Sequence, residues 1–330
     1  MKNTDLVSVV IPAYNAESTL DETLRSVRTQ THQSLEIIVV DDGSSDATSA
    51  IAERHAAVDA RVQLLKQDNA GVAVARNTGW QHATSDYIAF VDADDLWAPT
   101  KIEKQLHALL EGGEQVGLVY CWYVRIDSDS LIFGSGPFPL HQGDVLEHIF
   151  LGNFIGNGSS VLVRRQALID AAGFAPELRA AGAEGCEDFL FYCRVAEKHH
   201  FAVVPERLLG YRLLPNNMSS NRPKMLHSWM LVVDEMKERH PTLIKALKSG
   251  LINYSKWIIL DVIKHNTKQL PAVMRLILSK YPSIALKLML KDIPVTIYFE
   301  LRKRMIKQIS RQTVTSKAPK VERFFVGKLD

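Results

Sequence analysis

The chain has 330 residues, of which 46% are hydrophobic, and a net charge of +2 at pH 7. This composition predicts a globular protein in which one large domain with a buried core carries an appendage. The three cysteines, Cys121, Cys186 and Cys193, show no CxxC spacing, which argues against a disulfide framework or a zinc site and favours a cytoplasmic protein with reduced thiols. We find no secretion signal and no apolar run of eighteen residues, so we expect no membrane-spanning helix.

The charge is distributed unevenly along the chain. Residues 224–330 contain 21 Lys and Arg against 8 Asp and Glu, whereas residues 1–223 contain 18 against 29. We therefore expect an acidic body, residues 1–223, followed by a basic extension, residues 224–330, whose hydrophobic periodicity is helical. Such an excess of positive charge indicates an anionic partner, either a membrane surface or a nucleic acid.

The first part of the body alternates apolar runs with segments of helical spacing. Residues 6–11 and 35–40 stay apolar through consecutive positions, which is typical of strands buried on both faces of a parallel sheet. The expected elements, in chain order, are a strand at 6–11, a helix starting at 18 or 19, a strand at 35–40, a helix capped by 45 or 46, a strand at 62–65, a helix at 71–82 and a strand at 87–91. This series predicts an α/β fold with a mostly parallel sheet flanked by helices.

The second part of the body is less regular. Residues 117–122 and 159–163 are expected as strands, and the loops between 133 and 143 are rich in Gly and Pro. We expect this half to shape the side of the molecule that receives a second substrate.

Polar clusters directly follow three of the expected strands, at residues 12–15, 41–46 and 92–95. In open α/β sheets, ligands bind beyond the carboxyl ends of the strands, so one cleft is expected to gather all three clusters. The chain has neither a Gly-x-Gly-x-x-Gly sequence after the first strand nor a P-loop sequence. If the cleft binds a nucleotide, the charge of its phosphates must therefore be balanced by other groups.

The acidic cluster Asp92-Ala93-Asp94-Asp95 is a candidate metal site. Carboxylates crowded at one strand end repel one another unless a cation compensates them. Mg²⁺ and Mn²⁺ prefer oxygen ligands, typically one or two carboxylates together with substrate phosphates, which implies a nucleoside diphosphate as partner. The alternative is a solvated turn before a helix that Asp94 or Asp95 caps.

The other two clusters are candidates for nucleotide binding. Asp41 and Asp42 can accept hydrogen bonds from a base or from ribose hydroxyls, although a turn with a helix cap at Asp46 explains the same residues. Tyr14 is placed to stack on a nucleobase, and a turn tyrosine is the alternative. Arg76 is a candidate for the phosphate charge, with a surface arginine as the alternative.

Taken together, these segments resemble the successive signatures of glycosyltransferase family 2, in order and in spacing. The segments are Ile11-Pro-Ala-Tyr-Asn15, Val40-Asp-Asp-Gly-Ser44, Asn69-Ala-Gly71, Ala75-Arg-Asn77 and Phe90-Val-Asp-Ala-Asp-Asp95. The resemblance covers roughly residues 6–220. It implies a GT-A fold, an inverting mechanism, a nucleotide-diphosphate sugar donor and a requirement for Mn²⁺ or Mg²⁺.

The resemblance also implies roles for particular residues. It places Tyr14 and Asp42, with Asp41, around the base, and puts Asp92 and Asp94 in the family's DxD motif, with Asp94 as the metal ligand proper. The nucleotide-sugar site so implied comprises Pro12, Ala13, Tyr14, Asn15, Asp41, Asp42, Asn69, Arg76, Asp92, Ala93, Glu187 and Arg212.

The segment Gly185-Cys-Glu-Asp-Phe-Leu-Phe-Tyr-Cys-Arg194 looks like the family segment that carries the catalytic base, and Asp188 fits that role. A carboxylate at a helix N-terminus can remove the proton from an attacking hydroxyl. The alternative is that Glu187 and Asp188 only cap the helix. Near the end of the family domain, many members carry a histidine two positions after the residue that matches Arg212, where this chain has Leu214. Such a histidine can contact the metal or a phosphate, and Arg212 is expected to provide more of that contact here.

The basic extension is the remaining feature to interpret. Residues 276–291 and 298–309 mix large apolar side chains with Lys and Arg, as helices on an anionic membrane surface do. This pattern favours a glycan or lipid-linked acceptor, cell-surface polysaccharide or glycolipid biosynthesis, and a peripheral position at the inner face of the membrane. A helical subdomain packed on the body is the alternative. No nucleic-acid-binding motif accompanies the charge.

Two rival functions remain at this point. A nucleotidyltransferase shares an α/β cleft with acidic metal ligands but is expected to carry a Gly-rich basic loop after its first strand, which this chain lacks. A non-catalytic, membrane-associated sugar-nucleotide-binding or assembly protein is the other rival, and the presence of Asp92, Asp94 and Asp188 argues against it.

Overall fold

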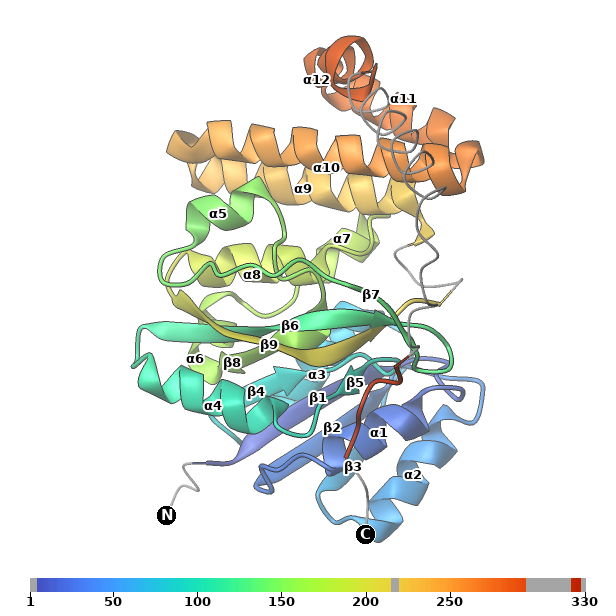
Figure 1. Ribbon diagram of the computed structural model, residues 1–330, viewed down its shortest axis with the longest axis vertical. Helices are drawn as coiled ribbons and strands as arrows, with labels where there is room; N and C mark the ends of the chain where they lie inside the picture. The colour runs from blue at the N-terminus through green and yellow to red at the C-terminus, as the bar shows by residue number, and fades with distance from the viewer. Residues whose placement is uncertain (1–4, 215–219, 295–321, 328–330) are drawn as a thin grey trace, which may run out of the picture.

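The computed structural model describes residues 5–214, 220–294 and 322–327. Within these ranges a nine-stranded sheet runs in the order β3-β2-β1-β4-β8-β6-β9-β5, with β7 paired to β6 (Figure 1). The strands are β1 Val7–Ala13, β2 Leu35–Asp41, β3 Val62–Lys66, β4 Tyr87–Phe90, β5 Leu96–Trp97, β6 Val116–Ile126, β7 Ile132–Ser135, β8 Val161–Arg164 and β9 His200–Arg212. β1 to β4 are parallel, so their carboxyl ends meet at one edge of the sheet.

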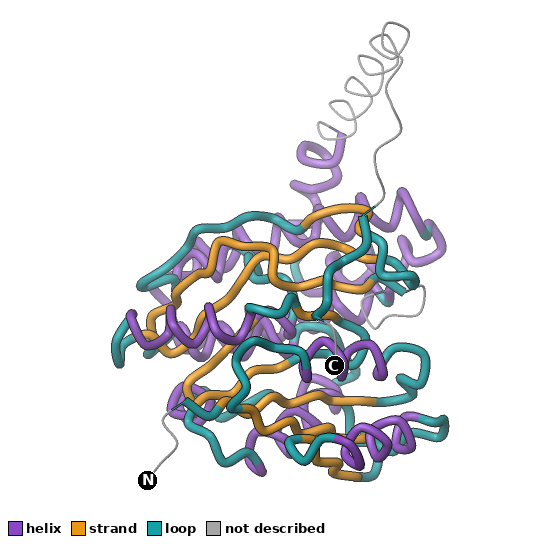
Figure 2. Tube along the Cα trace, turned by 60° about the horizontal axis from the view of Figure 1, so that its bottom comes forward, coloured by secondary structure: helices purple, strands orange, loops and turns teal. Residues whose placement is uncertain are grey.

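Helices cover both faces of this sheet, as the tube view of Figure 2 shows. The helices are α1 Leu20–Arg28, α2 Thr48–Val58, α3 Val72–His82, α4 Lys101–Glu111, α5 Leu146–Leu151, α6 Arg165–Asp170, α7 Glu177–Ala180, α8 Glu187–Ala196, α9 Arg222–Arg239, α10 Ile244–His265, α11 Leu270–Lys280 and α12 Pro282–Lys287. Successive residues of a strand point to opposite faces. Val9 and Ile11 accordingly pack with α1, α2 and α4, whereas Val10 and Val40 pack with α3, α6 and α8.

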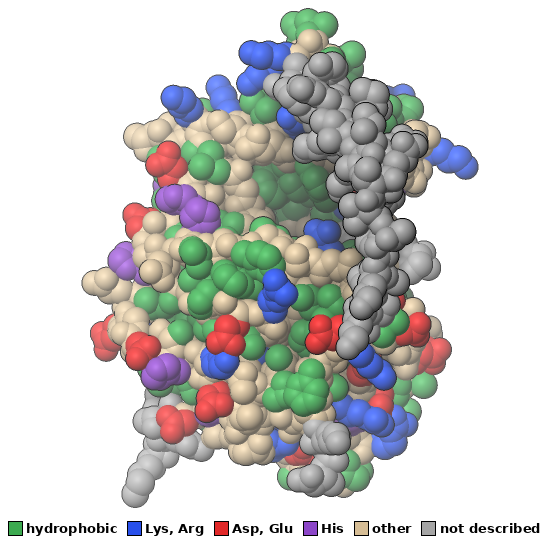
Figure 3. Space-filling view, viewed as in Figure 1, with side chains coloured by type: hydrophobic (Ala, Val, Ile, Leu, Met, Phe, Trp, Pro, Cys, Tyr) green, Lys and Arg blue, Asp and Glu red, His purple; other side chains and the backbone are tan. Residues whose placement is uncertain are grey.

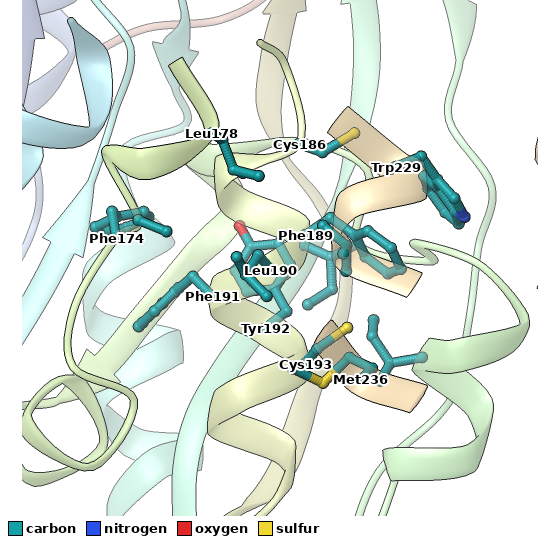
Figure 4. Close-up of a cluster of buried hydrophobic side chains, with 14 of the residues drawn as sticks. Phe174, Leu178, Cys186, Phe189, Leu190, Phe191, Tyr192, Cys193, Trp229 and Met236 are labelled. Carbon is teal, nitrogen blue, oxygen red and sulfur yellow. The ribbon is translucent and has the colours of Figure 1, made fainter. Parts of the chain in front are cut away.

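The C-terminal helices pack directly on the α/β body. α9 and α10 lie side by side over α5 and α8 (Figure 1). Phe189 of α8 stacks on Trp229 of α9 with ring centroids 4.0 Å apart, and Trp229 stacks on Tyr254 of α10 at 3.9 Å. Figure 4 shows Phe189 and Trp229 among the buried side chains around α8. These rings belong to the same hydrophobic core as one face of the sheet.

One glycine fixes how closely α10 approaches the body. A Cβ atom at Gly250 would lie only 2.1 Å from the carbonyl oxygen of Phe150 in α5. Any larger residue would therefore push α10 away from the chain segment beneath it.

The structure confirms the fold expected from the sequence. Each strand and helix expected between residues 6 and 91 is present, with ends shifted by a few residues. The three cysteines are buried and free, as expected for core thiols. The interpretation of Asp94 or Asp95 as a helix cap is wrong, because the short strand β5 follows and α4 begins only at Lys101.

No helix in the described ranges combines the length and the apolar character that crossing a bilayer requires. The segment 298–309, which the sequence interpretation assigned to a membrane surface, lies outside the described residues.

Candidate active site

Two adjoining cavities open beyond the carboxyl ends of β1, β2 and β4. The large cavity has a volume of about 530 Å³ and the small cavity about 410 Å³. They meet along Pro12, Tyr14, Val72 and Glu187, which line both. The expected cleft is therefore present at the expected edge of the sheet.

The structure brings most of the expected site residues to this cleft. The large cavity is lined by Pro12, Tyr14, Asn15, Arg76, Asp92, Ala93, Asp94, Glu187 and Asp188. The small cavity is lined by Pro12, Ala13, Tyr14, Asp42, Asn69 and Glu187. Asp41 and Arg212 line neither cavity.

Asp42 organises the wall of the small cavity. Its Oδ1 accepts hydrogen bonds from Gln67 Nε2 at 2.7 Å and from the Ala70 amide at 2.9 Å, and its Oδ2 accepts one from the Gly71 amide at 2.8 Å. Asn69 Nδ2 in turn donates to the Asp42 carbonyl oxygen at 3.0 Å. The buried carboxylate thus fixes the shape of the loop that leads into α3.

Arg179, which the sequence analysis did not single out, covers the same loop. Its Nη2 donates to Asn69 Oδ1 at 2.8 Å, and it lines the small cavity. Gly71 has a φ of +93°, and a Cβ atom there would lie 2.5 Å from Arg179 Nη1. The positive φ favours glycine at this position, and any side chain there would also displace the Arg179 guanidinium.

Asp41 points away from the cavities. Its Oδ1 accepts a hydrogen bond from the Ser44 amide at 3.0 Å, and its Oδ2 accepts one from Ser49 Oγ. Asp46 Oδ1 accepts from the Thr48 amide at 2.9 Å at the start of α2. These two carboxylates serve the turn and the helix start, as the alternative interpretation of this segment predicts.

Tyr14 and Asn15 form the rim between the two cavities. The Tyr14 side chain is 55% exposed, so its ring is accessible to a planar ligand. Asn15 adopts a φ of +48° and accepts a hydrogen bond at Oδ1 from the Ser45 amide at 2.9 Å. The asparagine thereby ties the end of β1 to the turn before α2.

Arg76 and Asp92 form an ion pair on the wall of the large cavity. Arg76 Nη2 lies 2.6 Å from Asp92 Oδ1, and only 5% of Arg76 is exposed. The interpretation of Arg76 as a surface arginine is therefore wrong. Burial alone would lower the pKa of Arg76, but the carboxylates of Asp92 and Asp188 raise it above its ordinary value. Arg76 is a permanent cation beside these acids.

The neighbouring carboxylates of Asp94 and Asp95 have different surroundings. Asp95 is fully buried and accepts hydrogen bonds from Ser159 Oγ at 2.5 Å and from the Arg212 amide at 2.9 Å. Among the described residues, no other residue forms a hydrogen bond or an ion pair with the Asp94 carboxylate. Burial, together with the charge of Asp92, raises the pKa of Asp94 to about 7.

Arg212 supports this acidic loop from behind. It is 1% exposed, and its Nε donates to the Asp94 carbonyl oxygen at 2.7 Å. Its Nη1 donates to the Asp127 carbonyl at 2.9 Å, and its Nη2 lies 2.8 Å from Glu22 Oε2. The guanidinium is therefore engaged with protein groups and holds the backbone of Asp94, and Leu214 reaches the cavity instead.

Glu187 and Asp188 begin helix α8 and line the same large cavity. Glu187 accepts hydrogen bonds from the Gly185 amide at 3.0 and 3.1 Å, which fixes the turn before the helix. Asp188 lines the large cavity with Asp92 and Asp94. Burial raises the pKa of Asp188 to about 7, against the opposing effect of Arg76. Asp188 is thus a carboxyl group that gains and loses a proton near neutral pH.

Comparison with known proteins identifies the family. Residues 8–170 match the model of glycosyl transferase family 2. The chain is 30% identical over 240 residues to the putative teichuronic acid biosynthesis glycosyltransferase TuaG of Bacillus subtilis. This alignment covers 71% of this chain and 90% of TuaG. It is also 30% identical over 263 residues to the Escherichia coli UDP-Glc:alpha-D-GlcNAc-diphosphoundecaprenol beta-1,3-glucosyltransferase WfgD, covering 79% and 95% of the two chains. This chain belongs to glycosyltransferase family 2.

Solved structures share the GT-A fold of this glycosyltransferase. TarS 1–349 of S. aureus in complex with UDP superposes with a TM-score of 0.62 at 18% identity, over 96% of this chain and 94% of TarS 1–349. The mannosyltransferase PcManGT of Pyrobaculum calidifontis, in complex with GDP-Man and Mn²⁺, gives a TM-score of 0.57 at 18% identity, over 92% and 84%. Neither the nucleotidyltransferase nor the non-catalytic alternative is favoured by these relatives.

A divalent cation fits the acidic end of β4 in this glycosyltransferase. The partly buried carboxylate of Asp94 lies beside that of Asp92, and its pKa is raised to about 7 although the charge of Arg212 opposes the rise, which is the situation a metal relieves. Mg²⁺ and Mn²⁺ bind through one or two carboxylates plus substrate oxygens, and Asp94 with Asp92 provides that number. Within the described residues no three His, Cys, Asp or Glu side chains are arranged to hold a metal, so a substrate would complete the ligand set.

Besides Arg179, sequence reasoning missed Asn157, which lines the large cavity. Its Oδ1 accepts hydrogen bonds from the Ser159 amide at 3.1 Å and from Ser160 Oγ at 2.8 Å. Its buried Nδ2, like Arg76 Nε, has no partner among the described residues. A buried donor without a partner costs free energy unless a ligand satisfies it. The signal in the sequence was the pair of glycines, Gly156 and Gly158, that flank it.

Proposed function

We propose that this glycosyltransferase transfers one sugar from a nucleoside diphosphate sugar to an acceptor hydroxyl with inversion at the anomeric carbon. The acceptor oxygen forms a bond to the anomeric carbon while the bond from that carbon to the diphosphate oxygen breaks. The acceptor proton passes to the carboxylate of Asp188, and the nucleoside diphosphate leaves. A single displacement of this kind inverts the configuration and requires no covalent intermediate.

Asp188 suits the role of general base because of its position and its pKa. It lies in the first turn of α8 and lines the same cavity as Asp92 and Asp94 at the end of β4. A pKa of about 7 is close to the working pH, where a general base both accepts and returns a proton readily.

The donor is held, in this proposal, across both cavities. Tyr14 stacks on the base at the rim, and the loop fixed by Asp42 and Asn69 forms the wall of the base pocket. Arg76 places a fixed positive charge beside the diphosphate. A bound Mn²⁺ or Mg²⁺, held by Asp94 with Asp92, supplies the further positive charge that stabilises the leaving diphosphate.

The observation that carries the proposal is the convergence of Asp92, Asp94 and Asp188 on one cavity beside Arg76. The experiment is to measure nucleoside diphosphate release from UDP-Glc, UDP-GlcNAc and GDP-Man with Mn²⁺, comparing the unmodified protein with Asp94→Ala and Asp188→Asn. Metal-dependent release from one donor, lost in both variants, is the expected result. If no donor is turned over and none binds in the presence of Mn²⁺, the proposal is overturned.

We further propose that the acceptor is a lipid-linked glycan in cell-surface polysaccharide or glycolipid biosynthesis, reached at the inner face of a membrane. The relatives support this, since TuaG is named for teichuronic acid biosynthesis and WfgD for a diphosphoundecaprenol substrate.

The surface of the C-terminal helices supports the same proposal. Residues 244–294 contain nine Lys and Arg against two Asp. Large apolar side chains are exposed among them on α11, α12 and the π-helix η5 (Leu288–Asp292), and Figure 3 shows green and blue side chains together at that end of the molecule. The four most prominent are Leu278, Leu286, Met289 and Leu290, with exposures of 48%, 58%, 50% and 73%. Exposed apolar groups among lysines match an anionic lipid surface.

This second proposal is tested by sedimentation with phospholipid vesicles that contain or lack anionic lipid. The unmodified protein is expected to sediment with the anionic vesicles, and the double variant Leu286→Ser, Leu290→Ser to remain in solution. Leu140→Ser, at a position that is 66% exposed on the body, is the matched control and is expected to behave as the unmodified protein. Equal binding of all three proteins contradicts the assignment of this surface.

A further inference from the structure

The segment Glu322–Gly327 returns to the α/β body at the far end of the chain. Figure 1 draws it in red, in front of β5 and α1. The Ile132 amide donates to the Glu322 carbonyl at 2.8 Å, and the Phe324 amide donates to the Ser130 carbonyl at 2.9 Å. These bonds add the segment to the hairpin between β6 and β7.

Phe324 anchors this segment in a small core of its own. The side chain is 8% exposed and packs with Leu96, Val124 and Ile126. Its ring also lies against Gly210, where a Cβ atom would be 3.0 Å from Phe324 Cγ. Leu96 directly follows Asp95 in the chain and pairs with Gly210 across the β5–β9 ladder. The phenylalanine therefore supports β5, which follows the acidic loop, and β9, which pairs with β5 and ends at Arg212.

A chain of polar contacts leads from the same segment to Asp94. Arg323 Nη2 lies 3.2 Å from Glu22 Oε1, and Glu22 Oε2 lies 2.8 Å from Arg212 Nη2. Arg212 Nε donates to the Asp94 carbonyl oxygen at 2.7 Å. Ser130, whose carbonyl accepts from the Phe324 amide, also donates its Oγ to Glu22 at 2.8 Å.

We propose that residues 322–327 form a strap that positions Asp94 for metal and diphosphate binding. Phe324 is the main positioning residue, since it packs against Leu96, the residue that follows the acidic loop, and against Gly210, which pairs with Leu96 in β9. Arg323 is the second. Groups that orient a ligand through a second layer of contacts typically change metal affinity or activity by about 10- to 100-fold when they are removed. This inference rests on the proposed function, because it concerns the metal site assigned to Asp94.

The neighbouring phenylalanines supply the test. Phe324 is buried, whereas Phe325 is 67% exposed, so Phe324→Ala and Phe325→Ala compare the same substitution at adjacent positions. Mn²⁺ binding is measured by loss of the free-ion EPR signal in the presence of UDP, and thermal unfolding is measured without metal. We expect Phe324→Ala to weaken Mn²⁺ binding by about tenfold, Phe324→Leu to restore most of the affinity, and Phe325→Ala to bind as the unmodified protein does.

Folding and positioning are separated by a second variant. Arg323→Ala removes only the contact to Glu22, at a side chain that is 68% exposed, and is expected to keep the native unfolding temperature with a smaller loss of affinity than Phe324→Ala. If the unmodified protein binds Mn²⁺ and UDP but the Phe324 and Phe325 variants bind it equally, the strap has no positioning role. If the unmodified protein itself binds no Mn²⁺ with UDP, the metal site assigned to Asp94 is overturned, and the positioning role of the strap with it.

Discussion

The two cavities of the cleft differ in how completely the protein satisfies its own polar groups. Around the small cavity, the carboxylate of Asp42 and the amide of Asn69 are already bonded to neighbouring chain segments. Around the large cavity, the amide nitrogen of Asn157 has no hydrogen-bond partner among the described residues, and the Asp94 carboxylate lies beside Asp92 with its pKa raised to about 7. The small cavity thus has a finished wall, whose polar groups are bonded within the protein. The large cavity has an unfinished wall, whose polar groups are left for a substrate to satisfy.

This difference indicates which wall adds to the free energy of unfolding and which wall lowers it. A finished wall presents a fixed shape and contributes favourable hydrogen bonds to folding. The wall of the large cavity holds partly buried carboxylates close together at an energetic cost, which is consistent with strong binding and catalysis once a cation and a substrate neutralise them. The predictions below change one side of this comparison at a time, beginning with the largest expected effect.

Asp188→Asn is expected to have the largest effect on turnover. The asparagine keeps the shape of the side chain but cannot accept the acceptor proton, so kcat should fall by about 10²- to 10⁴-fold with little change in the KM of the donor. Steady-state rates of nucleoside diphosphate release, with a glycan acceptor present, provide the measurement. Asp144→Asn, at an exposed position on the body, is the control. A kcat within a few-fold of the unmodified value would remove Asp188 from the mechanism.

The same substitution is expected to make the metal-free protein more stable at alkaline pH. The pKa of Asp188 is raised from 3.8 to about 7, so the folded state binds this proton more tightly than the unfolded state does. The stability that the neutral carboxyl contributes is complete below about pH 4 and is lost as the pH rises through 7. The loss is on the order of 4 kcal/mol for a shift of this size.

Thermal unfolding without metal measures this effect. Asp188→Asn should unfold at a higher temperature than the unmodified protein at pH 8, and the difference should disappear as the pH falls below about 4. Asp94→Asn should behave in the same way, because the pKa of Asp94 is also raised to about 7. If the substitutions instead lower the unfolding temperature equally at both pH values, folding does not raise the pKa of these carboxyl groups in the metal-free protein.

On the finished wall, Asp42→Asn should destabilise the protein at every pH. The amide group cannot accept all the bonds that Gln67, Ala70 and Gly71 now donate, and one lost buried bond costs about 1–3 kcal/mol. The KM of the donor should rise as the loop loses its shape. Asp41→Asn is the matched comparison, since Asp41 makes similar bonds outside the cavities, and it should lower the unfolding temperature without raising this KM.

Tyr14→Ala should produce the smallest change. The residue is 55% exposed, so the unfolding temperature should change little. Loss of stacking on a base, worth about 0.5–1.5 kcal/mol, should raise the KM of the donor by a few-fold, and Tyr14→Phe should restore it. An unchanged KM in Tyr14→Ala would place the base elsewhere.

The sequence was informative where the signal is local. Consecutive apolar residues in β1 and β2 predicted a sheet buried on both faces, and strand ends followed by acids predicted the edge where Asp92 and Asp94 lie. It was less informative about which polar groups are already used. Arg212 was expected at the substrate, but it is engaged with Glu22, 190 residues away. Arg179 reaches Asn69 across 110 residues, and no local pattern encodes such a contact.

The glycine at position 250 has a consequence for how such a chain can be divided or recombined. α10 touches the backbone of α5, and Trp229 of α9 stacks between Phe189 and Tyr254. The packed surfaces of the C-terminal helices and of the body therefore have to change together. A cut at residue 223 would leave Phe189 without its stacking partner. An exchange of this extension between relatives must therefore carry both packed surfaces, that of α9 and α10 and that of α5 and α8.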